Sequence, residues 1–169
     1  SFCGRVFGDT KPKCINSIDT PVFKKTKNLF CLNFAKSELN GRLILAEGYM
    51  DVIAMYQAGF HNVVATLGTA LTQEQSRIIS GYVDEVILSY DSDEAGQKAT
   101  KRAVGLLSAE GVKTKVLTIE GAKDPDEYIK KFGATRFKLL LDGSSSATDY
   151  ELEKLKEVHD IETAEGKVG

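Results

Sequence analysis

The chain has 169 residues, with 22 Lys and Arg against 24 Asp and Glu and a formal net charge of −2. This length suits one domain with a core of its own, or one domain with pieces of its neighbours, and nothing larger is expected within these residues. Cys3, Cys14 and Cys31 lack CxxC spacing, and with only 2 His in the chain they predict reduced thiols and no zinc site. The odd cysteine count and the lack of a signal peptide or long apolar run predict a cytosolic protein without a membrane partner.

Charge is divided unevenly along the chain. Residues 1–40 carry seven Lys and Arg against three Asp and Glu, which leaves 15 basic and 21 acidic residues for the remainder. A basic segment before an acidic body suits a protein that binds a polyanion with one part and cations with the other. A local excess of this size is also typical of an ordinary solvated surface.

Strand-like and helix-like segments alternate from residue 42 onward. Short apolar runs predict strands at 42–46, 62–66, 85–90 and 113–118. Helical periodicity and stop signals predict helices at 50–57, 72–79, 95–107, 126–132, 135–141 and 149–159, with a loop at 142–146 and a frayed end at 163–169. Thr72 and Gln75 have the spacing of a capping box. The alternation predicts an α/β fold with a doubly wound, mainly parallel sheet, whose functional residues gather beyond the carboxyl ends of the strands.

Three acidic clusters fall just past predicted strands. They contain Glu47, then Asp91 and Asp93, then Asp124 and Asp126. Carboxylates brought together at one sheet edge would form a site for hard divalent cations, which serve phosphoryl transfer. We expect the i, i+2 pairs to face metal ions and Glu47 to act as a bridging ligand or as a general acid or base.

Each acidic cluster alone also has an ordinary structural explanation. Asp93 is well placed to cap the helix that follows it, and Glu47 to favour a helix N-terminus. A lone Asp-Pro-Asp is usually a turn, and Asp51 is most simply expected to face solvent. The coincidence of all three clusters at strand ends favours the metal site.

Together these residues resemble the Toprim fold, which primases, type IA and type II topoisomerases and some nucleases share. The Toprim pattern has a Glu after the first strand and a DxD after the third, which Glu47, Asp91 and Asp93 match. Finer motifs are similar to those of the bacterial replicative, DnaG-type primases: EGYMDV at 47–52, LGT at 67–69, YDSDEAG at 90–96 and KDPD at 123–126. Basic stretches within residues 4–25 are similar to the segment before the Toprim part of those primases.

The primase resemblance implies an enzyme, a DNA-dependent RNA polymerase that makes short RNA primers on single-stranded DNA at bacterial replication forks. It implies two-metal catalysis with Mg²⁺ or Mn²⁺, ribonucleoside triphosphates as substrates, and a replicative helicase bound through a domain absent from this chain. Glu47, Asp91 and Asp93 would be catalytic, and these three with Asp124 and Asp126 would hold metal. The residues expected to contact nucleotide or template are Arg5, Lys13, Asn16 and Lys25.

The resemblance also implies a domain layout. Residues 1–40 would be part of a mixed α+β basic subdomain, 41–148 the Toprim domain, and 149–169 the start of a helical subdomain with a frayed tail. The chain thus resembles a middle section of the polymerase core, and that section alone is expected to be inactive or weakly active. Some positions depart from the family: Cys3 and Cys31 stand where glycine is usual, Cys14 replaces an aromatic residue and Lys24 replaces a His.

Two other functions stay open from the sequence. A Toprim nuclease or topoisomerase-like strand-cleaving enzyme would share the carboxylates but lack the upstream basic motif. A non-catalytic nucleic-acid-binding module would use the carboxylates only for folding.

Overall fold

The computed structural model describes residues 3–5, 14–68 and 70–158, with the side chains of all of these except Cys3, Arg5, Cys14, Asn16, Glu157 and Val158. The strands are β1 (Cys3–Arg5), β2 (Cys14–Asn16), β3 (Arg42–Ala46), β4 (Val63–Ala65), β5 (Glu85–Ser89), β6 (Lys113–Val116) and β7 (Ser145–Ser146). The helices are η1 (Lys25–Lys27), α1 (Leu32–Ala35), α2 (Tyr49–Gln57), α3 (Gln73–Ser80), α4 (Glu94–Ala109), α5 (Pro125–Asp142) and α6 (Ala147–Val158). The four strands predicted between residues 42 and 118 and the helices between them are confirmed.

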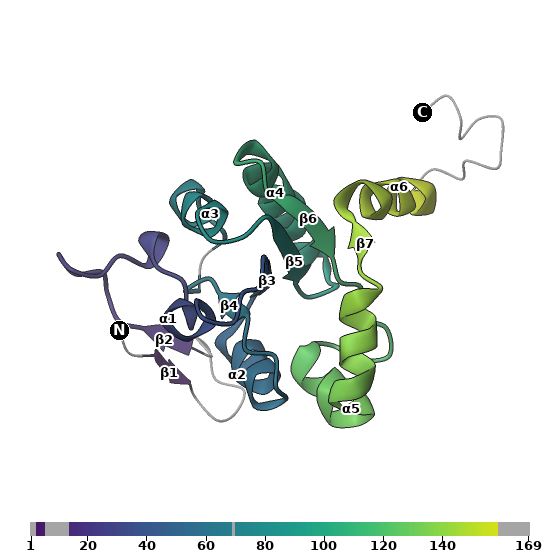
Figure 1. The fold of residues 1–169 in the computed structure, drawn as a ribbon, viewed down its shortest axis with the longest axis horizontal. Coiled ribbons are helices and arrows are strands. Elements are labelled where there is room, and N and C mark those ends of the chain that lie inside the picture. Colours follow the sequence, from purple (N-terminus) through teal and green to yellow (C-terminus); the bar gives the residue numbers. More distant parts are fainter. Residues whose placement is uncertain (1–2, 6–13, 69, 159–169) are drawn as a thin grey trace.

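One five-stranded sheet, in the order β4-β3-β5-β6-β7, forms the centre of the molecule (Figure 1). β3 pairs in parallel with β4 and β5, and β5 pairs in parallel with β6. Ala46 at the end of β3 lies opposite Ala65 of β4 and Ser89 of β5, so these strands end level with one another. The predicted doubly wound, mainly parallel α/β sheet is therefore confirmed.

The alternation of side chains along the strands builds a core on each face of the sheet. Leu43 of β3 belongs to a cluster that contains Leu107 of α4, whereas the next residue, Ile44, belongs to a second cluster with Phe137 of α5. Helices α3 and α4 cover the first face and α2 and α5 the second (Figure 1). Both faces are thus buried, as the continuous apolar runs of the strands require.

Two local features refine the predicted elements. The stretches predicted at 126–132 and 135–141 both lie in α5, and between them Gly133 leaves helical geometry with φ 82°. The loop predicted at 142–146 is wrong in part, because Ser145 and Ser146 form β7, antiparallel to β6. A strand of two serines has no apolar pattern from which to predict it.

The segment at 25–30 packs against the start of α3 and the edge of the sheet. The backbone of Phe30 pairs with that of Ala65 at the β4 edge, with N···O distances of 2.8 and 3.3 Å. The buried amide of Gln75 donates to the carbonyls of Lys25 and Asn28 at 3.0 and 2.7 Å. The same Gln75 completes the predicted capping box with Thr72. These bonds fix the chain around residues 25–30 against the sheet domain.

The three cysteines can be followed only in part. Cys31 is a free thiol, and its backbone has φ 68°, in the left-handed region. This conformation explains why glycine is usual at that position in the family that the sequence resembles. Burial raises the pKa of the Cys31 thiol, so the thiolate is disfavoured there. The side chains of Cys3 and Cys14 lie outside the described residues, as does the tail at 163–169.

None of the helices that the structure describes is long and apolar enough to cross a membrane. The domain boundaries after residues 40 and 148 stay predictions.

Replacing Phe137 should show how much the core beneath α5 contributes to stability. Its side chain is fully buried, edge-to-face with Phe60 at 5.2 Å between ring centroids. We expect Phe137→Ala to lower the free energy of unfolding by about 3–5 kcal/mol, through lost burial and the cavity left behind. Leu139, two residues along and 68% exposed, gives a matched control that should change stability by less than about 0.5 kcal/mol. Denaturant unfolding of both variants measures the difference, and equal losses would contradict this account of the core.

Candidate functional site

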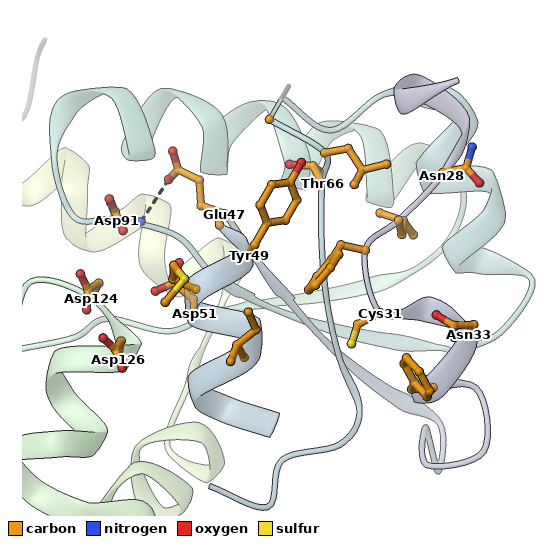
Figure 2. A pocket seen from close by; sticks show the side chains of 18 of the residues that line it. Asn28, Cys31, Asn33, Glu47, Tyr49, Asp51, Thr66, Asp91, Asp124 and Asp126 are labelled. Carbon is orange, nitrogen blue, oxygen red and sulfur yellow. Dashed lines mark hydrogen bonds between the residues drawn. The ribbon is translucent and has the colours of Figure 1, made fainter. Parts of the chain in front are cut away.

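Glu47 and Asp91 follow the two central strands at the point where the chain reverses its winding direction. After β3 the chain runs to α2 on one face of the sheet, whereas after β5 it runs to α4 on the other face. The two loops therefore diverge and leave a crevice beyond the strand ends, which is where doubly wound sheets bind ligands. Within it, the backbone N–H of Asp91 donates to Oε2 of Glu47 at 3.4 Å (Figure 2).

Helices α2, α4 and α5 begin at this edge of the sheet. Two of the predicted metal ligands, Asp93 and Asp124, are the N-caps of α4 and α5. Oδ1 of Asp93 accepts from the Gly96 N–H at the start of α4, and Oδ1 of Asp124 accepts from the Glu127 N–H at the start of α5, both at 2.8 Å. The ordinary capping explanation for Asp93 is thus confirmed. It does not compete with metal binding, because each cap uses one carboxylate oxygen and leaves the other.

Asp51 belongs to the same acidic cluster, although the sequence predicted that it would face solvent. That prediction is wrong: Asp51 is partly buried in the first turn of α2 and lines the pocket with Asp91 and Asp124. The N–H of Gly48, the N-cap residue, donates to its carboxylate. This is one half of a capping box, and Asp three residues after a Gly N-cap is the sequence signal that could have identified it.

Burial, together with the charges of neighbouring carboxylates, raises the pKa values of three acids in the cluster. Burial, then the charges of Asp124 and Asp91, raise the pKa of Asp51 to about 7, although the Gly48 hydrogen bond opposes the shift. Burial likewise raises the pKa of Glu47 and of Asp91, with neighbouring carboxylates adding to both shifts. The ammonium of Lys123 acts in the other direction on Asp91.

The carboxylates line one end of an open pocket of about 970 Å³. In Figure 2, Glu47, Asp51, Asp91, Asp124 and Asp126 lie on one side of it. An adjoining hollow of about 450 Å³ shares Glu47, Asp51 and Asp91 and extends toward Tyr90 and Ala99. All the predicted metal residues except Asp93 line the larger pocket, and Asp93 stands exposed at the start of α4.

The donor set fits a divalent cation that is shared with a substrate. Among the residues that the structure describes, no three His, Cys, Asp or Glu side chains lie close enough to hold a metal ion by themselves. Magnesium usually keeps several waters and is held by one or two carboxylates plus substrate phosphates, without a cage made entirely of protein. Carboxylate oxygens spread around one open pocket suit that mode of binding.

The predicted phosphate-binding residues can be placed only in part. Lys25 lies in η1 beside α3, and among the described residues its ammonium makes no ion pair. Arg5 and Asn16 lie in the paired strands β1 and β2, but their side chains, and the whole of Lys13, lie outside the described residues. Lys123, which sequence reasoning did not assign to the site, lines the pocket among the carboxylates.

Comparison with known proteins places this site in a family. Residues 44–129 match the Toprim-like family model. The chain belongs to this family. The matched residues of this Toprim-like chain include Glu47, Asp51, Asp91, Asp93, Asp124 and Asp126.

Relatives of this Toprim-like chain are primases in both sequence and structure. The DNA primase of Clostridium acetobutylicum is 42% identical over 99% of this chain, which covers 28% of that protein. A crystal structure of a DNA primase domain from Pseudomonas aeruginosa matches with a TM-score of 0.85 and 35% identity, over 98% of this chain and 54% of that one. A DnaG primase catalytic domain bound to single-stranded DNA matches with a TM-score of 0.83 and 30% identity, over 98% and 54%. The DnaG-type resemblance and the Toprim-type fold are therefore confirmed.

Gly96 should prove necessary for the position of Asp91. A Cβ at Gly96 would overlap the carbonyl oxygen of Asp91 and come within 2.8 Å of its carbonyl carbon, and backbone cannot swing aside. We expect Gly96→Ala to cost about 1–3 kcal/mol of stability through overpacking, and to weaken Mn²⁺ binding by displacing Asp91.

Gly105 is the control, because it lies on the same helix with nothing within 4 Å of an added Cβ. Gly105→Ala should stabilise the chain by about 0.4–1 kcal/mol and leave Mn²⁺ affinity unchanged. Unfolding curves measure the stability of both variants, and calorimetry measures their Mn²⁺ affinity. If Gly96→Ala had the stability and Mn²⁺ affinity of the parent, the close contact between residue 96 and the Asp91 carbonyl would be contradicted.

The stability of the metal-free chain should fall as pH rises through the acidic-to-neutral range. The pKa of Asp51 is raised to about 7 in the folded chain. At pH values between the ordinary pKa of Asp and about 7, the folded chain therefore binds more protons than the unfolded chain. The stabilising effect of the proton is complete below the ordinary Asp pKa and is lost as pH rises through about 7. The slope contributed by one such group is at most about 1.4 kcal/mol per pH unit. We expect Asp51→Asn to flatten the dependence of unfolding free energy on pH between 5 and 8 in the presence of a chelator, whereas Asp84→Asn, on the exposed surface, should not. A parental slope in Asp51→Asn would rule out Asp51 as the source.

Proposed function

We propose that the chain is the Toprim part of a bacterial DNA primase, a nucleotidyltransferase that makes RNA primers on single-stranded DNA at replication forks. The observation that carries the proposal is Glu47 beside Asp91 at the crevice of a chain that matches a DNA primase along 99% of its length. The chain spans about a quarter of that relative's length, 28%, so its activity belongs to a larger protein. Further partners would be ribonucleoside triphosphates, the primer, and a replicative helicase bound through a domain outside these residues.

Asp91, Asp93, Asp124 and Asp126 would hold divalent cations, with Glu47 either as a further ligand or as the general base. Bound Mg²⁺ or Mn²⁺ would neutralise the substrate phosphates and polarise the phosphorus under attack. Asp93 and Asp124 each keep one carboxylate oxygen on a helix N-terminus, which fixes the direction of the other oxygen. Asp126 is held in the same way by the ammonium of Lys130, at 2.6 Å. These fixed oxygens preorganise the site, so little reorganisation is needed when substrate arrives.

Glu47 would take the proton from the primer 3′-hydroxyl. As the hydroxyl oxygen bonds to the α-phosphorus, the bond from that phosphorus to the pyrophosphate oxygen breaks and pyrophosphate leaves. One oxygen of Glu47 accepts from the Asp91 N–H, which leaves the second oxygen for the hydroxyl proton. Its raised pKa supports this role, because a general base works best when its pKa approaches the working pH.

The basic segment would contact phosphates. Arg5, Lys13 and Lys25 would bind the template or the nucleotide, with Asn16 as a polar contact. Such contacts position a polyanion and carry little base information. The printed description of the solved relative, a DnaG catalytic domain bound to single-stranded DNA, supports a single-stranded template as the polyanion.

Calorimetry on this chain and primer synthesis by the parent enzyme together test the proposal. We expect Asp91→Asn with Asp93→Asn to abolish Mn²⁺ binding to the chain, whereas Glu151→Gln, on the exposed face of α6, should leave it intact. In the full-length enzyme, Glu47→Gln should cut priming by about 10²–10⁴-fold with template binding nearly unchanged, as for a group that moves a proton in the transition state. Unaltered Mn²⁺ binding in the double variant would remove the metal site, and parental priming by Glu47→Gln would remove the role of Glu47.

A further inference from the structure

The pocket that holds the carboxylates extends well beyond them, and its lining changes from charged to aromatic. Its volume of about 970 Å³ is near the upper end for small-molecule sites and exceeds what metal ions alone need. Away from the carboxylates its walls come from the N-terminal segment and the outer face of α2. We call this end the aromatic lobe, which comprises Phe23, Phe30, Phe34, Tyr49, Met50 and Ile53.

Apolar side chains of the lobe stand open to the pocket. Phe34 is 59% exposed, Met50 46% and Ile53 39%. Isolated exposed apolar residues are ordinary, but a group of them inside one concave pocket marks a binding surface. The lobe therefore presents a surface that a ligand would cover.

Tyr49 connects the lobe to the acidic end. It lies two residues after Glu47, and its ring packs on Phe30 with 5.0 Å between centroids and 53° between planes. In Figure 2, Tyr49 stands between the carboxylates on one side and Cys31 and Asn33 on the other. A ligand bound across the pocket would thus touch both ends at once.

The rim of the lobe carries two side-chain amides. Asn28 donates to the carbonyl of Lys24 at 2.7 Å, which fixes the orientation of its amide. The exposed Asn33 has no hydrogen-bond partner within the described part of the chain. Asparagine amides offer a donor and an acceptor side by side, which suits the edge of a nucleobase.

We propose that the aromatic lobe stacks the base of the nucleoside triphosphate whose phosphates lie at the carboxylate end. This assignment rests on the proposed function and deepens it, because it sets the orientation of the nucleotide in the site. Every base has a π face that stacks on aromatic rings whatever its sequence, as a polymerase that accepts four nucleotides requires. An apolar peptide would also cover Phe34, but it would leave the carboxylate end of the same pocket without a charged partner.

The test compares a ligand that has a base with one that has none, each in the presence of Mg²⁺ and this chain. The first probe is 2-aminopurine riboside triphosphate, whose fluorescence is quenched when its base stacks. The second is inorganic tripolyphosphate, followed by calorimetry. We expect Phe34→Ala to weaken binding of the nucleotide by about 5- to 100-fold, the range for one base stacked on one aromatic ring, and to leave tripolyphosphate affinity unchanged. Leu139→Ala, which removes an apolar side chain of similar exposure outside the pocket, should change neither.

The outcomes separate the lobe from the metal site. If the nucleotide binds no tighter than tripolyphosphate, or if Phe34→Ala binds it like the parent, the lobe is not a base site while the proposed function stands. If a single-stranded DNA oligonucleotide displaces the nucleotide without affecting tripolyphosphate, and loses that ability in Phe34→Ala, the lobe holds a template base and the assignment to the incoming nucleotide is overturned. If the parent chain binds neither probe, the proposed function fails and the lobe with it.

Discussion

Mutual repulsion among carboxylates at the carboxyl ends of β3, β5 and β6 is the constraint on which the site depends. Two like charges 4 Å apart repel by about 4 kcal/mol at the effective dielectric typical of a protein surface. Asp51 and Asp124 do not relieve this repulsion by turning outward, because the Gly48 N–H holds Asp51 and the cap of α5 holds Asp124. Burial first, and then the neighbouring carboxylates, raise the pKa values of Glu47, Asp51 and Asp91. Stability is therefore lost at this edge, and a cation that bound there would restore part of it.

The helix caps also show why a structural explanation of these aspartates does not exclude a functional one. A carboxylate has two oxygens, and a cap occupies one of them. Asp93 and Asp124 accordingly start α4 and α5 and each keep one oxygen that the cap does not use, and Asp124 also lines the pocket. The N-termini of α2, α4 and α5 all lie at this edge, and their dipoles favour the negative charge of carboxylates and of phosphates. The arrangement is thus suited to a substrate anion as well as to its cations.

Much of the fold follows from local sequence signals, whereas the missed features depend on contacts distant in sequence. Apolar runs and helix stop signals were enough for β3 to β6 and for α2 to α4, and Thr72 with Gln75 predicted the start of α3. Glu47, Asp91 and Asp124 could be placed at one edge because parallel strands end together. The spacing of Gly48 and Asp51 could have indicated that Asp51 turns back toward the helix N-terminus, but its burial also depends on α5 packing beside α2, a contact distant in sequence. The two serines of β7 were missed because only their pairing with β6 makes them a strand.

One buried side chain, that of Gln75, fixes the chain just before Phe30 of the aromatic lobe against the start of α3. Gln75 caps α3 with its amide oxygen and holds the carbonyls of Lys25 and Asn28 with its amide nitrogen. Two residues after Asn28, the backbone of Phe30 pairs with the edge strand β4 and its ring packs at a tilt against Tyr49, which begins the helix after Glu47. A shift of the basic segment would therefore move the aromatic lobe and the start of α2 together, and with them Glu47 and Asp51. Contacts that ordered phosphates on the basic segment and contacts that ordered metal at the carboxylates would act on the same few backbone elements. This shared framework gives a physical route by which polyanion binding and metal binding would strengthen each other, because each pays part of the ordering that the other requires.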